Sequence, residues 1–289
     1  SPNTNYYFMV TAVDSAGNMG NLSNVVGPVK TEISSEEDYA LYFDGNDAVN
    51  LATSPLNLEP NWTYSSWIKP NTIGGNAMPV IYSEGSPNLN LKIYFDAQGR
   101  IKFQALNGGY WDYSSSDINL VDFETWNYIS ITLENGGYDS GPIKFYKNGE
   151  LFSTTNGQME NSNAGYAMLG GNTGYFYGNQ LNDPFLGIMD ETQIWHRTLT
   201  EIEISERMYA NLDPTETGLI GYWRFNDGEG SSIVEDISNS DGDNSYNTGT
   251  IIGNPVWVDG YSMSPQQPQN LSAEAGAGKI TLTWDLGTE

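Results

Sequence analysis

Short stretches in which apolar and polar residues alternate recur along this chain, and they constrain its fold more than any other feature. Tyr39, Leu41 and Phe43 alternate before a turn at residues 44–47. The other alternating stretches run through Leu89, Leu91, Ile93 and Phe95, through Ile101, Phe103 and Ala105, through Ile129, Ile131 and Leu133, through Ile143 and Phe145, and over residues 219–225. A period of two places successive side chains on opposite faces of a strand. Many such strands between turns rich in Gly, Asn and Asp predict an all-β, antiparallel sandwich of two sheets.

Two turns predict hairpins. The sequence DAQG at residues 96–99 separates two alternating stretches. Asn148 and Gly149 follow a third stretch, and Asn-Gly is the strongest short signal for a hairpin turn. Both turns therefore join antiparallel neighbours in the predicted sheets.

Residues 187–198, GIMDETQIWHRT, place two acids inside an apolar strand. Strict alternation puts Ile188, Asp190, Thr192 and Ile194 on one face and Met189, Glu191, Gln193 and Trp195 on the other. A carboxylate that shares a face with two isoleucines is costly to bury unless it meets a cation or several donors. The pair is either part of a metal site or a solvated strand end, and the spacing leaves both open.

A short helix is predicted directly after this strand. Thr200 is followed three residues later by Glu203, which is the capping-box pattern. The helical turn is expected to continue through Ile204 to Tyr209.

Composition excludes several classes of function. The chain of 289 residues has 36 acidic and 11 basic residues, a formal net charge of −25. Such a surface repels phosphate backbones and anionic head groups, attracts divalent cations and suits a salty medium. The absence of cysteine excludes disulfides, thiolate nucleophiles and Cys-based zinc sites. No run approaches the ~18 apolar residues of a membrane span, and no signal peptide is found. Because the sequence starts and stops inside recognisable patterns, we expect a piece of a longer polypeptide.

The two ends of the chain carry a different pattern. A Tyr-containing strand at residues 6–13 ends in the turn DSAGN at residues 14–18. This segment resembles the last two strands of a fibronectin type III domain, and residues 265–289 resemble the first two strands of another. The implied domains are the C-terminal part of one such domain at residues 1–31, a linker at 32–38, a central domain at 39–261, and the N-terminal part of a following domain at 262–289.

Five pieces of the central domain carry a second resemblance. They are ALYFDG at residues 40–45, WTYSSWIKP at 62–70, KFYKNG at 144–149, the strand and helix at 187–209, and GLIGYWRFNDGEG at 218–230 with Asp236, Ser238 and Trp257. In order and spacing they resemble a laminin G-like domain of the concanavalin A-like lectin superfamily. The resemblance implies a jelly-roll sandwich of two curved antiparallel sheets.

Members of that family often hold one structural calcium beside the first strand. Matched to this sequence, the ligands would be Asp44, the backbone carbonyl of Gly45, Asn46 and Asp47, with Asp190 across the sandwich edge. Calcium takes about six to eight oxygens from carboxylates, amides and carbonyls. The alternative is a simple turn, because turns use these same residues.

A second acidic stretch lies at residues 226–229 and continues at Asp236 and residues 241–243. It could also take a cation, but we interpret it as a solvated loop.

No catalytic residue is predicted, and we expect no enzyme. A retaining glycanase needs two carboxyls about 5 Å apart on one face of its cleft, whereas Asp190 and Glu191 are adjacent and predicted to point to opposite faces. The single histidine, His196, is accompanied by no G-x-S-x-G motif and is interpreted as a surface residue.

Two loops are predicted to bind ligand. Their candidate residues are Tyr110, Trp111 and Tyr113 in the first loop and Asn172, Tyr175 and Tyr177 in the second. Aromatic rings stack on the apolar face of a pyranose, and amides and carboxylates take its hydroxyls. In the alternative interpretation, one or two of these rings close the end of the sandwich.

These observations predict a non-catalytic extracellular module that binds carbohydrate or another surface ligand. We expect it in a secreted or cell-surface, adhesin-like multidomain protein of bacterial origin, or as an accessory module of a polysaccharide-degrading enzyme. The alternative is a structural spacer in a surface stalk that has no ligand of its own.

Overall fold

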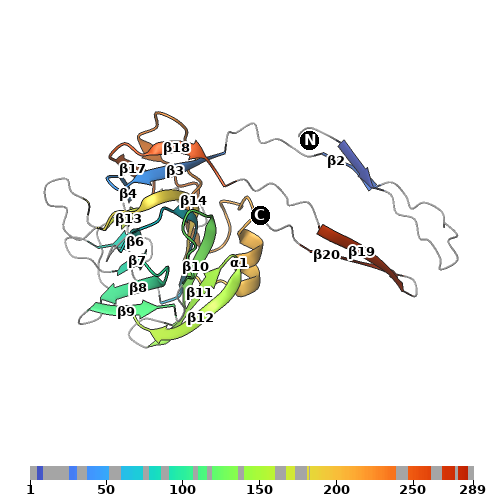
Figure 1. The fold of residues 1–289 in the computed structure, drawn as a ribbon, viewed down its shortest axis with the longest axis horizontal. Helices are drawn as coiled ribbons and strands as arrows, with labels where there is room; N and C mark the ends of the chain where they lie inside the picture. Colours follow the sequence, from blue (N-terminus) through green and yellow to red (C-terminus); the bar gives the residue numbers. More distant parts are fainter. Residues whose placement is uncertain are drawn as a thin grey trace. The chain divides into compact units, whose positions relative to one another are not determined.

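The computed structural model divides the chain into two compact units, residues 38–262 and residues 1–37 with 263–289. The structure describes residues 5–8, 26–30, 38–51, 60–73, 78–85, 91–106, 110–115, 119–135, 140–159, 167–172, 181, 183–238, 247–261, 269–276 and 279–285 (Figure 1).

The smaller unit contains two antiparallel strand pairs. β1 (Asn5–Phe8) pairs with β2 (Val26–Lys30), and β19 (Gln269–Gly276) pairs with β20 (Lys279–Asp285). Their assignment to fibronectin type III domains stays a prediction, and the predicted turn at residues 14–18 lies outside the described residues.

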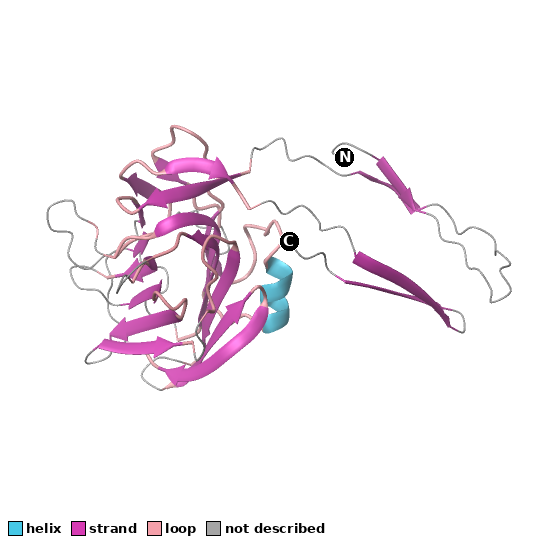
Figure 2. Ribbon diagram, viewed as in Figure 1, coloured by secondary structure: helices cyan, strands magenta, loops and turns pink. Residues whose placement is uncertain are grey.

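Residues 38–262 form two antiparallel sheets that face each other as a sandwich, which confirms the predicted all-β jelly-roll class (Figures 1 and 2). The first sheet has the order β12 (Glu150–Gly157), β11 (Gly141–Lys147), β10 (Asn127–Leu133), β5 (Trp62–Pro70), β14 (Leu186–Trp195), β3 (Tyr39–Asp44) and β18 (Val256–Asp259), with β15 (Leu219–Trp223) paired to β14. The second sheet has the order β16 (Ile233–Val234), β17 (Gly249–Ile252), β4 (Ala48–Leu51), β13 (Ala167–Leu169), β6 (Val80–Glu84), β7 (Leu91–Phe95), β8 (Ile101–Leu106) and β9 (Tyr110–Ser114).

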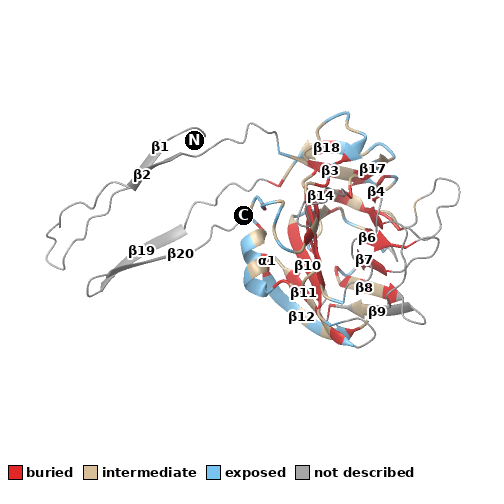
Figure 3. Cartoon of the chain, turned by 180° about the vertical axis from the view of Figure 1, so that it is seen from behind, coloured by how far each residue is buried: buried red, intermediate tan, exposed pale blue. Residues whose placement is uncertain are grey.

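The core lies between the sheets and is made by the inward-facing side chains of both. Figure 3 colours many residues of the two sheets as buried. The buried residues that alternation predicted are Leu41, Phe43, Leu91, Ile93, Phe95, Ile101, Phe103, Ala105, Ile129, Ile131, Leu133, Ile143 and Phe145. Leu89 lies outside the described residues. Each fully buried aliphatic or aromatic side chain contributes roughly 1.5–3 kcal/mol of transfer free energy, so these strands stabilise one another chiefly through their inward faces.

Both predicted hairpins are present. β7 and β8 pair across residues 96–99, and β11 and β12 pair across Asn148 and Gly149. Asn148 has a φ of 51° and Gly149 a φ of 84°, the left-handed pair that a primed two-residue turn requires. A Cβ on Gly149 would also lie 3.1 Å from the Cα of Ser205 in the helix, so glycine serves both the turn and the packing of the helix there.

Strand β14 pairs with three neighbours. β5 lies along one side of it, whereas on the other side β3 pairs with residues 186–189 and β15 with residues 192–195. The change of partner falls at Asp190 and Glu191, the acidic pair within the apolar strand.

A β-bulge at Glu191 makes the predicted alternation of this strand wrong. The pairing with β5 sets Asp190 and Gln193 on one face although three positions separate them. Glu191 has a φ of 47° and is the extra residue. Met189 and Ile194 consequently both belong to the core, and Asp190 does not share a face with Ile194.

The predicted capping box is confirmed at the start of α1 (Glu201–Arg207), the one helix in the described part of the chain. The Thr200 hydroxyl accepts the N–H of Glu203 at 3.3 Å, and the Glu203 carboxylate accepts the N–H of Thr200 at 2.9 Å. The helix ends at Arg207, two residues before the predicted Tyr209. No helix among the described residues has the length and apolar character to cross a membrane.

The first and last strands of the sandwich are neighbours. β3 and β18 pair antiparallel with Tyr39 opposite Asp259. Beyond the pair, the N–H of Gly260 donates to the carbonyl of Asp38 at 2.9 Å. The chain therefore enters and leaves this unit at the same end of one strand pair.

Candidate functional site

The turn at residues 44–47 is held by its own carboxylates. Asp44 Oδ1 accepts the N–H of Asn46 at 2.8 Å, and Asp47 Oδ2 accepts the N–H of Asp44 at 2.9 Å. The other oxygen of Asp47 accepts the N–H of Asn254 at 2.7 Å, which ties the turn to the segment before β18. Burial raises the pKa of the Asp47 carboxyl above its ordinary value. These contacts are those of a structural turn.

Asp190 is fully buried, on the face of the first sheet that points away from the core. Its Oδ1 accepts the N–H of Glu191 and its Oδ2 accepts the N–H of Tyr261, both at 2.8 Å. Burial raises the pKa of Asp190 well above its ordinary value, and the neighbouring charge of Glu191 raises it further. Asp190 thus holds the segment by which the chain leaves the sandwich.

Glu191 is also buried. It links β14 to Tyr222 in β15 and to Arg224, which follows that strand. The hydroxyl of Tyr222 donates to Glu191 Oε2, and the Nε of Arg224 lies 3.5 Å from Glu191 Oε1. Burial raises the pKa of Glu191 to about 7, although the Tyr222 hydrogen bond and the charge of Arg224 lower it. The acidic pair is therefore an internal bridge, neither a solvated strand end nor an exposed pair.

The structure does not bring the five predicted calcium ligands together. The pairing of β3 with β14 sets Leu186 opposite Asp44, so Asp190 lies four residues farther along, about 13 Å at roughly 3.3 Å per residue. Both oxygens of Asp47 and both of Asp190 accept backbone N–H groups. In the described part of the chain, no three His, Asp or Glu side chains are grouped closely enough to hold a metal ion. The set does not fit a calcium site.

Asp236 is not in a solvated loop, contrary to the interpretation of its acidic stretch. It is fully buried, and its carboxylate accepts the N–H groups of Tyr222 at 2.8 Å, Ser238 at 2.9 Å and Asn247 at 3.0 Å. It therefore fixes the backbone after β15.

Tyr110, Trp111 and Tyr113 lie in strand β9 and not in the predicted loop. Alternating aromatic residues favour a strand, and β9 pairs with β8 so that Tyr113 lies opposite Phe103. The Tyr113 ring stacks on Phe103 with centroids 6.1 Å apart, and its hydroxyl accepts the N–H of Gln158 at 3.2 Å. Tyr113 is half-buried and packs against the core from the edge strand of its sheet.

The second predicted ligand group is only partly described. Asn172 is 8% exposed, so little of it can meet a ligand. Tyr175 and Tyr177 lie outside the described residues, as do the side chains of Tyr110 and Trp111. For those four residues ligand binding stays a prediction.

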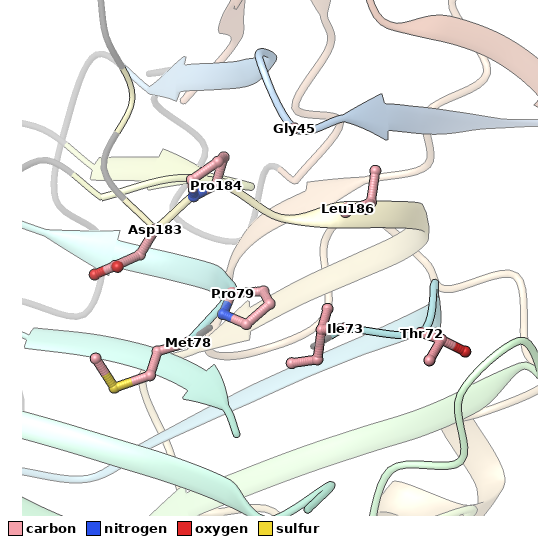
Figure 4. A pocket seen from close by; sticks show the side chains of 8 residues that line it. All are labelled: Gly45, Thr72, Ile73, Met78, Pro79, Asp183, Pro184 and Leu186. Carbon is pink, nitrogen blue, oxygen red and sulfur yellow. The ribbon is translucent and has the colours of Figure 1, made fainter. Parts of the chain in front are cut away.

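A pocket of about 450 Å³ opens where three connections meet (Figure 4). It is lined by Gly45, Thr72, Ile73, Met78, Pro79, Asp183, Pro184 and Leu186. Pro184 and Leu186 lie on one side and Met78, Pro79 and Ile73 on the other, with Asp183 toward one end and Thr72 toward the opposite end (Figure 4). Its volume falls within the ~300–1,000 Å³ typical of small-ligand sites.

Backbone hydrogen bonds fix the pocket walls. The carbonyl of Leu186 accepts the N–H of Asn71, and the carbonyl of Asp183 accepts the N–H of Val80, at 3.0 and 2.9 Å. Between them Phe185 is fully buried, with its ring 5.8 Å from that of Phe43. The segment before β14 is thus anchored in the core while its neighbouring side chains face the pocket.

Asp183 carries the charge of the pocket wall. Its Oδ2 lies 3.4 Å from Lys92 Nζ, and the two side chains are 33% and 8% exposed. Lys92 also lies over the ring of Tyr94, 4.5 Å from its centroid. Asp183 has a φ of 48°, a conformation that Asp and Asn adopt more readily than other non-glycine residues. The carboxylate is therefore positioned by backbone and ion pair together.

Of the pocket residues, sequence reasoning singled out Gly45 alone. The signal that could have found the walls is proline: Pro79 immediately precedes β6, and Pro184 lies two residues before β14. A proline restricts the residue before it, usually to an extended conformation. Met78 and Asp183 are the residues so restricted, although Asp183 departs from the usual conformation with a φ of 48°.

Comparison with protein-family models matches residues 43–205, more than half of the chain, to the concanavalin A-like lectin/glucanases superfamily. A comparison with curated proteins finds no match.

Comparison with solved structures finds one with a TM-score above 0.5, which shows the same fold, and others with lower scores. A candidate carbohydrate-binding protein from Bacteroides ovatus is 16% identical with a TM-score of 0.57, over 81% of this chain and 62% of that one. This chain therefore spans less than two thirds of that protein. A native heptameric SAP-like pentraxin from Limulus polyphemus is 16% identical with a TM-score of 0.46, over 60% and 82% of the two chains. The CBM40 of the Ruminococcus gnavus IT-sialidase, bound to α2,3-sialyllactose, is 15% identical with a TM-score of 0.44, over 58% and 95%.

Proposed function

This chain belongs to the concanavalin A-like lectin/glucanases superfamily, and from that premise we propose that its sandwich is a non-catalytic carbohydrate-binding module. The pocket of Figure 4 is the observation that carries the proposal. Its volume accommodates a sugar ring, and its wall combines apolar surface with a few placed polar groups. The candidate carbohydrate-binding protein of Bacteroides ovatus has the same fold.

The pocket chemistry matches the two sides of a sugar. The C–H face of a pyranose is apolar and packs against Ile73, Pro79 and Pro184, whereas the ring hydroxyls need acceptors and donors. The carboxylate of Asp183 accepts hydrogen bonds from two adjacent hydroxyls, and the hydroxyl of Thr72 donates or accepts one. A charged acceptor strengthens such bonds, so Asp183 is the expected anchor of the ligand.

The carboxylate content of the pocket lining indicates that the ligand is bound and not hydrolysed. Glycoside hydrolysis generally uses two carboxyls that flank the bond to be broken. Asp183 is the one carboxylate among the described residues that line the pocket. Asp190 and Glu191 are buried and engaged in internal bonds. We therefore assign no catalytic residue.

We further propose that the module serves a secreted or cell-surface multidomain protein, as part of an adhesin or beside a polysaccharide-acting domain. The strand pairs of residues 5–30 and 269–285 indicate further β-structure outside the sandwich. The net charge of −25 suits a protein exposed to salt. Calcium has no part in this proposal, because the residues expected to bind it do not fit.

The test is a glycan-array screen of the full chain, followed by calorimetry on the best ligand. The double variant Ile73→Ala/Met78→Ala removes apolar wall and should weaken binding about tenfold. The matched control is Ile233→Ala/Leu151→Ala, which truncates two residues that are each 44% exposed and do not line the pocket. Equal affinity of both variants would place the ligand elsewhere, and no binding to any glycan would favour the structural-spacer alternative.

A further inference from the structure

We propose that the pocket selects uncharged sugars and rejects glycans that carry carboxylate or sulfate groups. The proposal rests on the function proposed above and concerns the same pocket. The observation behind it is an acidic surround in which the lysine that pairs with the lining carboxylate of Asp183 is almost fully buried.

Three carboxylates belong to residues that line the pocket or adjoin its lining residues. Asp183 lines it directly. Asp44 immediately precedes the lining residue Gly45 and is exposed. Glu124 is also exposed, and its carboxylate accepts the N–H of the lining residue Thr72 at 2.7 Å. Asp183 and Glu124 thus place negative charge in the lining and against it, and Asp44 adds an exposed carboxylate next to Gly45 in the sequence.

Lys92 is the cation that pairs with this wall, and its charge is balanced by that of Asp183. Its ammonium lies 3.4 Å from Asp183 and its side chain is 8% exposed. The ring of Tyr94 covers one side of the ammonium at 4.5 Å. The lysine thus offsets one carboxylate and presents almost no surface to solvent.

Two segments of the sequence that adjoin lining residues contain no charged side chain. Residues 74–77 join Ile73 to Met78, and residues 173–182 lead to Asp183; neither segment contains Lys, Arg, Asp or Glu. A second lysine, Lys102, lies 5.9 Å from the centroid of the same Tyr94 ring. The three carboxylates of Asp44, Glu124 and Asp183 still outnumber the two lysines, so the local charge is negative. An anionic ligand meets this field in a pocket of reduced dielectric, where repulsion is stronger than in water.

The experiment compares matched pairs of glycans on the full chain. Each neutral oligosaccharide that binds on the array is tested by calorimetry beside its uronic-acid or sulfated counterpart, at low and at high sodium chloride. We expect the anionic member to bind at least tenfold more weakly at low salt. The difference should shrink at high salt because ions screen the repulsion, whereas the neutral member should change little.

The variant Asp183→Asn tests the origin of the selectivity. Asparagine tolerates the left-handed conformation of this position and leaves the ammonium of Lys92 without its counter-ion. Anionic glycans should then gain at least threefold relative to neutral ones. The control Glu216→Gln breaks another ion pair, with Arg207 at 2.6 Å and a 26% exposed carboxylate, away from the pocket, and should leave the ratio unchanged.

The outcomes separate the two proposals. Neutral binding with anionic discrimination that Asp183→Asn reduces supports the inference. Neutral and anionic members that bind equally at low salt would overturn it and leave the carbohydrate-binding module standing. Binding to no glycan would overturn the module and the selectivity together. Discrimination that Asp183→Asn leaves unchanged would show that this pocket does not cause it.

Discussion

Two carboxylates seven residues apart, Asp183 and Asp190, have opposite surroundings. Asp190 has no exposed surface, and both of its oxygens accept backbone N–H groups. The Asp183 side chain is 33% exposed, and its partner is the side chain of Lys92. A carboxylate whose acceptors are used by the backbone serves the fold, whereas one that keeps open oxygens at a pocket can serve a ligand. The role of each carboxylate, in the fold or toward a ligand, thus depends on its burial and on its hydrogen-bond donors more than on its position in the sequence.

The largest effect expected from this comparison is the loss of folding stability caused by Asp190→Ala. The substitution leaves the N–H groups of Glu191 and Tyr261 without acceptors in a buried site, and each such loss costs about 1–3 kcal/mol. The free energy of unfolding, measured by urea denaturation, should fall by on the order of 3 kcal/mol. The control Asp44→Ala removes an exposed acceptor and should cost below about 1 kcal/mol. Equal losses in the two variants would contradict the contrast.

The next effect concerns pH and Glu191. Its pKa in the folded protein is about 7, above the ordinary value of 4.5. The stability linked to this group is fully present below pH about 4.5 and is lost as pH rises through about 7. Glu191→Gln should remove this loss, so the variant gains on the order of 3 kcal/mol relative to wild type between pH 4.5 and 8. Parallel pH profiles of unfolding free energy for the two proteins would disprove the assignment.

At the pocket, Asp183→Asn should differ from Asp190→Ala. It should change the free energy of unfolding little and change ligand selectivity clearly. The ion pair with Lys92 is partly exposed, so its loss should cost about 1 kcal/mol or less in thermal or urea unfolding. A loss as large as that of Asp190→Ala would mean that Asp183 belongs to the fold, and the division between the two carboxylates would fail.

The smallest effect is expected from Thr72→Val, which replaces one exposed hydroxyl by a methyl group. Stability should not change measurably, and glycan affinity should fall about threefold, as the loss of one neutral hydrogen bond predicts. Thr250→Val, at an exposed position of β17, is the matched control and should leave affinity unchanged. Calorimetry on both variants distinguishes a pocket contact from a general change of the surface.

The fold could be predicted because its signals are local and repeated. Alternation located the buried residues of β7, β8 and β10, the Asn148-Gly149 pair located a hairpin, and Thr200 located the helix start. Each signal depends on neighbours within a few residues, and the same face is buried along each strand. The sandwich class follows from the number of such strands.

The site could not be predicted in the same way. Gly45, Met78 and Asp183 come from three connections that are distant in the sequence, and only the packing of the sheets brings them together. At Glu191 the strict alternation failed because one residue adopts a left-handed conformation, which no apolar pattern reveals. The aromatic stretch from Tyr110 to Tyr113 has the composition of both a sugar platform and a strand, and the structure shows the strand.

The pairing of the first and last strands also has a mechanical consequence. Because Tyr39 lies opposite Asp259 and the chain enters and leaves beside them, tension applied through the two ends acts on β3 and β18 at one end of their ladder. The hydrogen bonds between the two strands are then loaded and broken one after another. This requires less force than breaking all of them at the same time. The N–H of Tyr261, held by Asp190, and that of Gly260, held by the carbonyl of Asp38, stand first in this sequence. The force at which the sandwich opens, and hence its unfolding rate under load, is set at these two bonds.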